Sequence, residues 1–189
     1  MRWILLISAA AAITYARPPA SASPAEGDRR CAVSGLVSVE GPVHVRSGPG
    51  RRFPSTGIIP ARDPNAEMDR PASFDVIEAR GGWFRVANAA PWSASNEPVQ
   101  GVSGWLSGRE VAFSLQTHLG FAEPDPSSEV RWRSESMEEP ETLAALDCSG
   151  EWVKLLFSRG GEVRQAWFRG VCDNPDTSCD MPPGDAYRD

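Results

Sequence analysis

Short apolar or β-branched runs alternate with clusters of Gly, Pro and polar residues through the chain from residue 36 onward. In the first half these runs are VHV at 43–45, FDVIEA at 74–79, WFRVA at 83–87, GWL at 104–106 and VAF at 111–113. Runs of this kind between turn residues are typical of β-strands. Beyond the N-terminus no segment keeps an apolar period of about 3.6 residues, so we expect little helix. The pattern predicts an all-β fold of the sandwich or small-barrel type.

The N-terminal segment MRWILLISAAAAITYA (1–16) has the pattern of a secretory signal peptide. Arg2 precedes an apolar run, and small residues follow that run, as in such peptides. Cleavage after Ala16 and cleavage after Ala22 both fit, and a retained N-terminal anchor is the alternative. The apolar run is too short to span a bilayer. We therefore expect a periplasmic or secreted protein whose mature chain has no membrane span.

The chain contains four cysteines, Cys31, Cys148, Cys172 and Cys179. An even number of cysteines in an exported protein favours disulfides over free thiols. Cys172 and Cys179 enclose a short polar loop and can pair locally, which leaves Cys31 to pair with Cys148. A Cys148–Cys172 disulfide is the alternative that the sequence leaves open.

Composition argues against several classes of protein. The chain has 25 acidic and 19 basic residues, and an acidic balance disfavours a nucleic-acid partner. The spacing of the cysteines and of the two histidines matches no zinc site, and the loop acids have no calcium-loop spacing. We find no phosphate loop, dinucleotide fingerprint or serine elbow. We therefore expect no metal and no cofactor.

Three motifs in series carry a family resemblance. They are VHVRSGPGRRFPSTGIIP (43–60), FDVIEARGGWFRVA (74–87) and GWLSGREVAF (104–113). The first pairs a short strand with an Arg-Ser-Gly-Pro-Gly turn and an aromatic residue, the second holds a Gly-Trp strand, and the third is a closing Gly-Trp-Leu segment. In this order and spacing they resemble the bacterial SH3 domain, the SH3b family. The resemblance implies a small SH3-like β-barrel.

The second half of the chain can be laid on the first as a divergent repeat. The segment LGFAEPDPSSEVRWR (119–133) matches the opening motif from Val43 but lacks Arg-Ser-Gly. The later matches are Gly150 on Gly81, Trp152 on Trp83, Trp167 on Trp105 and Gly170 on Gly108. We therefore expect tandem small SH3-like β-barrels. The predicted parts are an unstructured leader at 17–35, domain 1 at 36–114, a divergent domain 2 at 118–179 and a flexible tail at 180–189.

The string DCSG at 147–150 also resembles the active-site signature of NlpC/P60 cysteine peptidases. A nucleophilic cysteine needs a nearby base, usually a histidine, and in that family the histidine follows the cysteine. Here both histidines, His44 and His118, precede Cys148, and Glu151 stands where the family has an apolar residue. We therefore interpret DCSGEW as the turn and strand start of the second repeat and expect no enzyme.

The SH3b resemblance implies a non-catalytic binding module of the cell envelope. Its expected partner is peptidoglycan peptide or glycan. The candidate binding residues are Arg46, Ser47, Phe53, Trp83, Trp92 and Trp105. The Arg46 guanidinium can pair with a stem-peptide carboxylate, or it can simply brace the turn. The alternative interpretation of Trp83 and Trp105 is barrel core, and that of Trp92 is a cap on the barrel end.

A second hypothesis is an interaction or scaffold protein that binds another envelope protein. Two long connections, at 62–73 and 88–101, lengthen the first repeat. Loops carry function more often than the scaffold that holds them, so these two connections are the candidate contact surface.

Overall fold

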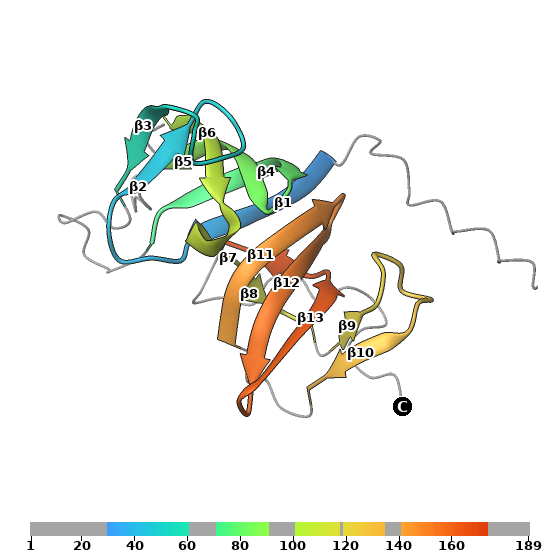
Figure 1. The fold of residues 1–189 in the computed structure, drawn as a ribbon. Helices are drawn as coiled ribbons and strands as arrows, with labels where there is room; N and C mark the ends of the chain where they lie inside the picture. The colour runs from blue at the N-terminus through green and yellow to red at the C-terminus, as the bar shows by residue number, and fades with distance from the viewer. Residues whose placement is uncertain (1–29, 61–70, 91–100, 118, 135–140, 174–189) are drawn as a thin grey trace, which may run out of the picture.

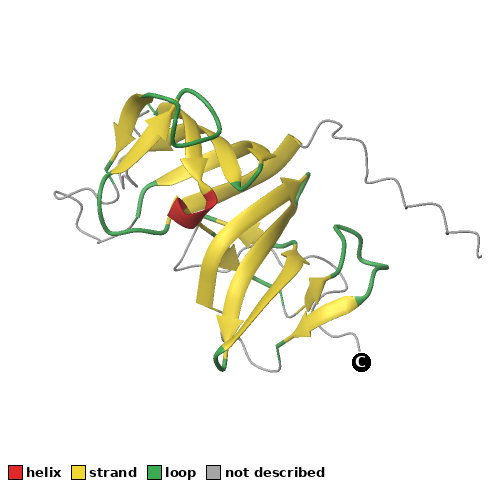
Figure 2. Ribbon diagram, viewed as in Figure 1, coloured by secondary structure: helices red, strands yellow, loops and turns green. Residues whose placement is uncertain are grey.

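The computed structural model describes residues 30–60, 71–90, 101–117, 119–134 and 141–173. In this part of the chain the fold is all-β, as the sequence predicts, and its one helical element is the short 3₁₀ turn η1 (Gly108–Glu110). Two small curled sheets contain most of the strands (Figure 1 and Figure 2). Among the described residues there is no apolar helix of a length that would cross a membrane.

The first sheet is built from the first half of the chain. Its strands are β1 (Arg30–Val37), β2 (Val43–Arg46), β3 (Ser55–Ile59), β4 (Ser73–Arg80), β5 (Trp83–Ala90), β6 (Val102–Ser107) and β7 (Val111–Ala112). Their order is β3-β2-β6-β5-β4-β1-β7. Gly81 and Gly82 have positive φ angles of 57° and 75°, which suits the two-residue turn that joins β4 to β5.

The second sheet is built from the second half. Its strands are β9 (Leu119–Phe121), β10 (Val130–Arg133), β11 (Glu141–Ser149), β12 (Trp152–Arg159) and β13 (Glu162–Phe168), in the order β10-β9-β13-β12-β11. Two short strands, β8 (Ser114–Leu115) and β14 (Val171–Cys172), pair separately.

The strand order of the second sheet repeats that of the first sheet from β3 to β4. Trp105 pairs with Arg85 in the first sheet, and Trp167 pairs with Lys154 in the second. The two turns likewise place Gly150 on Gly81. The later sequence matches therefore have the register that the sequence predicts.

The opening match of the repeat is wrong by one residue. Arg46 pairs with Ser55 and Trp105, whereas Phe121 pairs with Val130 and Trp167. Phe121 therefore takes the place of Arg46, although the sequence match puts it on Val45. The match aligned the apolar starts of the two segments, and a single sequence does not show which residues share a ladder rung.

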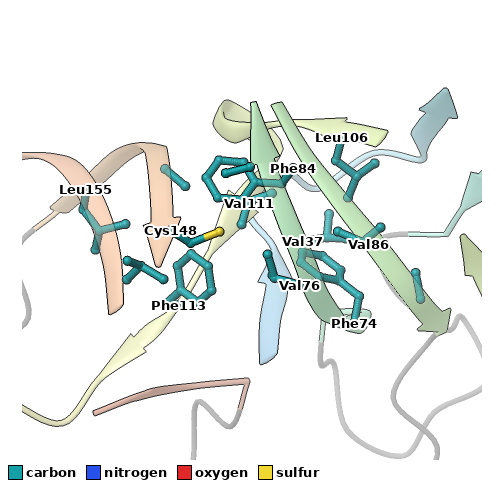
Figure 3. Packing of buried hydrophobic residues seen from close by; sticks show 14 of the residues in the cluster. Val37, Phe74, Val76, Phe84, Val86, Leu106, Val111, Phe113, Cys148 and Leu155 are labelled. Atoms are coloured by element: carbon teal, nitrogen blue, oxygen red, sulfur yellow. The ribbon is translucent and has the colours of Figure 1, made fainter. Parts of the chain in front are cut away.

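One continuous core lies beneath both sheets. It joins residues of the first sheet such as Phe84 and Leu106 to residues of the second such as Cys148 and Leu155, all four of them with no measurable exposure. Figure 3 shows Cys148 next to Phe113, between the two groups of side chains. The two units consequently share buried surface and stabilise each other, which matters because a domain of this size buries only a modest core alone.

The two sheets are also linked through the backbone. The Ala32 N–H donates to Gly150 O, and the Gly150 N–H donates to Arg30 O, each at 2.8 Å. A disulfide joins Cys31 to Cys148 beside these bonds. This is the first of the two pairings that the sequence allows, and it rules out the Cys148–Cys172 alternative. Cys172 is itself disulfide-bonded, while Cys179 lies outside the described residues.

The start of the first unit differs from the prediction. Strand β1 begins at Arg30, so residues 30–35 are part of the first sheet and not of an unstructured leader. The reason is that this segment pairs with β4 on one side and meets Gly150 at its end, contacts that its own composition does not reveal. Residues 1–29 and 174–189, with the predicted signal peptide and tail, lie outside the described residues.

Candidate functional site

Three predicted binding residues lie on the side of the first sheet that faces away from its core, and two more lie at the turn beside it. Residues opposite each other in a ladder point to the same side. Trp105 of β6 is opposite Arg46 of β2 and Arg85 of β5. Trp83 shares this side with Arg85 because the two are separated by one residue, and Arg80 is opposite Trp83. We call Arg46, Arg80, Trp83, Arg85 and Trp105 the arginine–tryptophan face.

The two tryptophans of this face differ in exposure. Trp105 is only 8% exposed even though the neighbouring Leu106 points into the core. The Arg80 guanidinium lies 5.9 Å from the centre of the Trp105 ring, within the range of a cation–π contact. Trp83 is half-buried. Trp105 is therefore buried, as the core interpretation expects, although strand alternation puts it on the side opposite Leu106.

One carboxylate balances part of the positive charge of the face. Glu78 of β4 pairs with Arg80 at 2.9 Å and with Arg85 at 3.9 Å. The two arginine side chains remain 61% and 54% exposed. Ion pairs this exposed contribute little to stability, so both guanidinium groups can exchange Glu78 for a ligand carboxylate at small cost.

Arg46 has a structural role that the sequence already offered as an alternative. Its Nη1 atom donates to Phe53 O at 2.8 Å and to Arg51 O at 3.2 Å. These bonds brace the turn between β2 and β3. A Cβ atom on Gly48 would lie 2.5 Å from the Phe53 ring, so the glycine is needed for this aromatic side chain to fold onto the turn.

The other predicted residues have mixed outcomes. The Ser47 side chain is exposed, and the Ser47 N–H donates to Pro54 O at 3.1 Å within the turn. Phe53 is half-buried against the turn, with the Arg52 guanidinium 5.3 Å from the centre of its ring. Trp92 and most of the two long connections lie outside the described residues.

The DCSG string forms the end of strand β11 and the start of the hairpin turn to β12. Gly150, with a φ of +57°, lies between β11 and β12. Cys148 has no measurable exposure and its sulfur is in the disulfide, so it presents no thiolate. His44 is exposed, as its strand position predicts, with Nδ1 3.2 Å from Ser55 Oγ. His118 lies outside the described residues.

Sequence reasoning missed Arg80, Arg85 and Glu78. A signal for them was present, because in EARGGWFR the residues flanking the Gly-Gly turn alternate with the buried positions. Period-two alternation puts Arg85 on the same side as Trp83. The link between Arg80 and Trp105 required the ladder register, which joins segments far apart in the sequence.

Comparisons with known proteins add no relative. No protein-family model matches the chain, and no curated protein or solved structure is significantly similar to it. The SH3b resemblance therefore stays a prediction that depends on the three motifs. Among the described residues no three His, Cys, Asp or Glu side chains gather where they could hold a metal ion.

Proposed function

We propose that this protein is an exported, non-catalytic binding module of the bacterial cell envelope, and that the arginine–tryptophan face binds peptidoglycan. The observation that carries the proposal is the row of Arg46, Trp105 and Arg85 on adjacent strands, with Arg80 and Trp83 beside it. Peptidoglycan combines sugar rings, which pack on aromatic side chains, with stem-peptide carboxylates, which pair with guanidinium groups.

Under this proposal the residues of the arginine–tryptophan face have different roles. Trp83 and the rim of Trp105 supply flat apolar surface, and Arg80 and Arg85 supply charge-assisted hydrogen bonds to a carboxylate. Arg46 holds the adjacent turn through Nη1 and acts as a positioning residue. Binding without turnover agrees with the disulfide at Cys148, which removes the nucleophile that the DCSG string suggested.

Co-sedimentation of the oxidised protein with purified peptidoglycan sacculi tests the proposal. We expect the protein to pellet and the supernatant to contain no released fragments. The double variant Arg80→Gln/Arg85→Gln should weaken binding about tenfold or more, since each charge-assisted hydrogen bond contributes about 1.5–3 kcal/mol.

The matched control is Arg109→Gln. Arg109 is an exposed arginine on η1 that does not belong to the face, so its loss removes a charge without touching the proposed site and should leave pelleting unchanged. Failure of the wild-type protein to pellet would contradict the proposal, and released fragments would contradict its non-catalytic part.

A further inference from the structure

A pocket of about 510 Å³ opens on the second sheet, on residues separate from the arginine–tryptophan face. Strand β10 and the β12–β13 hairpin form its wall. The polar and aromatic residues that line it are Arg131, Trp132, Arg133, Arg159, Glu162 and Arg164. A volume of this size is within the range of small-molecule sites, so the pocket accommodates a ligand of several atoms.

The pocket lies at the end of the β12–β13 hairpin, where the side of the sheet that faces the core changes from apolar to charged residues. Phe157 is opposite Arg164, and Arg159 is opposite Glu162, so these three charged residues lie on the same side of the sheet as the core residue Phe157. Trp132 contacts the Phe157 ring edge-on, with the ring centres 5.9 Å apart. The apolar core therefore borders the pocket on this side of the sheet, next to Arg159 and Arg164.

The lining is strongly positive in a chain of net charge −6. It contains four arginines and one acidic residue, Glu162, and Arg131 also pairs with Glu129 at 3.8 Å. Glu162 pairs with Arg164, and the Arg159 guanidinium lies 6.0 Å from the Trp132 ring centre and 3.5 Å from Ser134 Oγ. Guanidinium groups donate and never accept hydrogen bonds, so the pocket presents far more donors than acceptors.

The Trp132 indole forms part of the pocket wall. Trp132 is 5% exposed, and its Nε1 atom is the one buried side-chain nitrogen or oxygen among the described residues that has no hydrogen-bond partner. Nearly all buried polar groups in proteins have a partner. The N–H itself has almost no accessible surface, so the indole acts as a reporter of the pocket wall and not as a donor to a bound molecule.

We propose that this pocket binds a small ligand bearing two or more oxyanion groups, carboxylate or phosphate, with Arg159 and Arg164 pairing to the anions beside the Trp132 ring. Planar guanidinium groups match both anions in a two-bonded geometry. The site is distinct from the proposed peptidoglycan-binding face, and either can fail without the other.

Titration of the ¹⁵N-labelled oxidised protein with citrate and with pyrophosphate, followed by the indole N–H signals, tests the proposal. The Trp132 signal is assigned by its absence in Trp132→Phe. We expect this signal to shift on titration, because an anion bound against the Trp132 ring changes the environment of the indole proton. A shift with citrate alone identifies carboxylate as the preferred chemistry, and a shift with pyrophosphate alone identifies phosphate.

Two variants of the pocket are expected to change the affinity for the anion in opposite directions. Arg164→Gln should weaken binding about tenfold, as expected for the loss of a charge-assisted pair. Glu162→Gln should strengthen binding, since it removes the negative charge of the lining and releases Arg164. Arg109→Gln, outside the pocket, controls for non-specific charge and should change nothing.

The outcomes separate cleanly. A Trp132 shift that saturates, weakens in Arg164→Gln and tightens in Glu162→Gln supports the pocket. No shift with either anion, or equal weakening in Arg164→Gln and Arg109→Gln, would overturn it. Backbone signals that stay dispersed in each variant show that the fold is retained.

Discussion

The two sheets share one strand order but treat their outer sides differently. In the first sheet this side carries Arg46 and Arg85 around Trp105. In the second sheet the equivalent positions hold Phe121, Lys154 and Trp167. Phe121 and Trp167 join Leu119 and Trp152 in a separate buried cluster, whose members are at most 8% exposed.

This difference suggests different roles for the two units: the outer side of the first is available for binding, and that of the second is used for packing. The first unit has a guanidinium group at Arg46, where the second unit has the buried Phe121, whereas Arg85 is matched by another cation, Lys154. The core sides differ in a complementary way. Trp132 stands where the first unit has Gly57, so the second unit has an aromatic wall, and a pocket beside it, that the first does not form at that position.

The two connecting turns follow the same division. The connection at 47–54, SGPGRRFP, is basic and is braced by Arg46. The connection at 122–129, AEPDPSSE, is acidic and is held by its own side chains, with Asp125 Oδ1 accepting from the Ser127 N–H and hydroxyl at 2.7 Å each. Each turn is therefore stable through a different set of hydrogen bonds.

Exchanging the equivalent residues Phe121 and Arg46 should give the largest effect. Phe121→Arg puts a charge where the side chain has no exposure and should lower the free energy of unfolding by at least about 4 kcal/mol. Arg46→Phe loses two hydrogen bonds to turn carbonyls and should cost about 2 kcal/mol. Denaturant unfolding measures both losses of unfolding free energy. Equal losses would contradict the claim that the outer side is buried in the second sheet and exposed in the first.

Removing the disulfide should have the next largest effect. The bond joins residues separated by 117 positions, and cross-links over long loops stabilise mainly by restricting the unfolded chain. Cys31→Ser/Cys148→Ser should therefore lower stability by about 4 kcal/mol. Thermal unfolding of the variant checks this, and an unchanged midpoint would show that the two sheets do not depend on the link.

Substituting Gly108 tests the packing between the two units. A Cβ atom there would lie 1.9 Å from Ala145 O of β11, so Gly108→Ala must push η1 away from the second sheet and should cost about 2–3 kcal/mol. Gly41→Ala is the control, because a Cβ atom at that position meets no atom within 4 Å. The prediction fails if the two variants unfold at the same denaturant concentration.

Acidification should produce the smallest effect, confined to the turn of the second unit. The two Ser127 hydrogen bonds hold the pKa of Asp125 below its ordinary value of 3.8. A carboxylate with a lowered pKa contributes stability above about pH 4, which is lost as the pH falls through its folded-state pKa. NMR titration should show the lowered pKa, and Ser127→Ala should raise it; identical values in both proteins would contradict this.

The sequence predicted the strands better than the surfaces they form. Gly-Gly at 81–82 and the alternation after Trp83 placed a hairpin correctly because both are local signals. The burial of Trp105 on the outer side and the replacement of Arg46 by Phe121 depend on ladder register between distant segments. Strand β1 was missed because its pairing with β4 is equally distant.

The arginine pocket escaped the sequence for the same reason. Arg131 and Arg133 are far in sequence from Arg159 and Arg164, and only the fold brings them to one cavity. In the sequence alone, each of these arginines is indistinguishable from an ordinary solvent-exposed charge.

Pelleting of Trp83→Ala and Trp152→Ala with peptidoglycan sacculi tests the central claim most directly, since these residues hold equivalent positions in the two units. If the first unit binds and the second is structural on this side, Trp83→Ala weakens pelleting while the protein stays folded. Trp152→Ala lowers the unfolding midpoint but leaves pelleting of the folded protein unchanged. The reverse result, or equal loss of pelleting in both variants, would contradict the account.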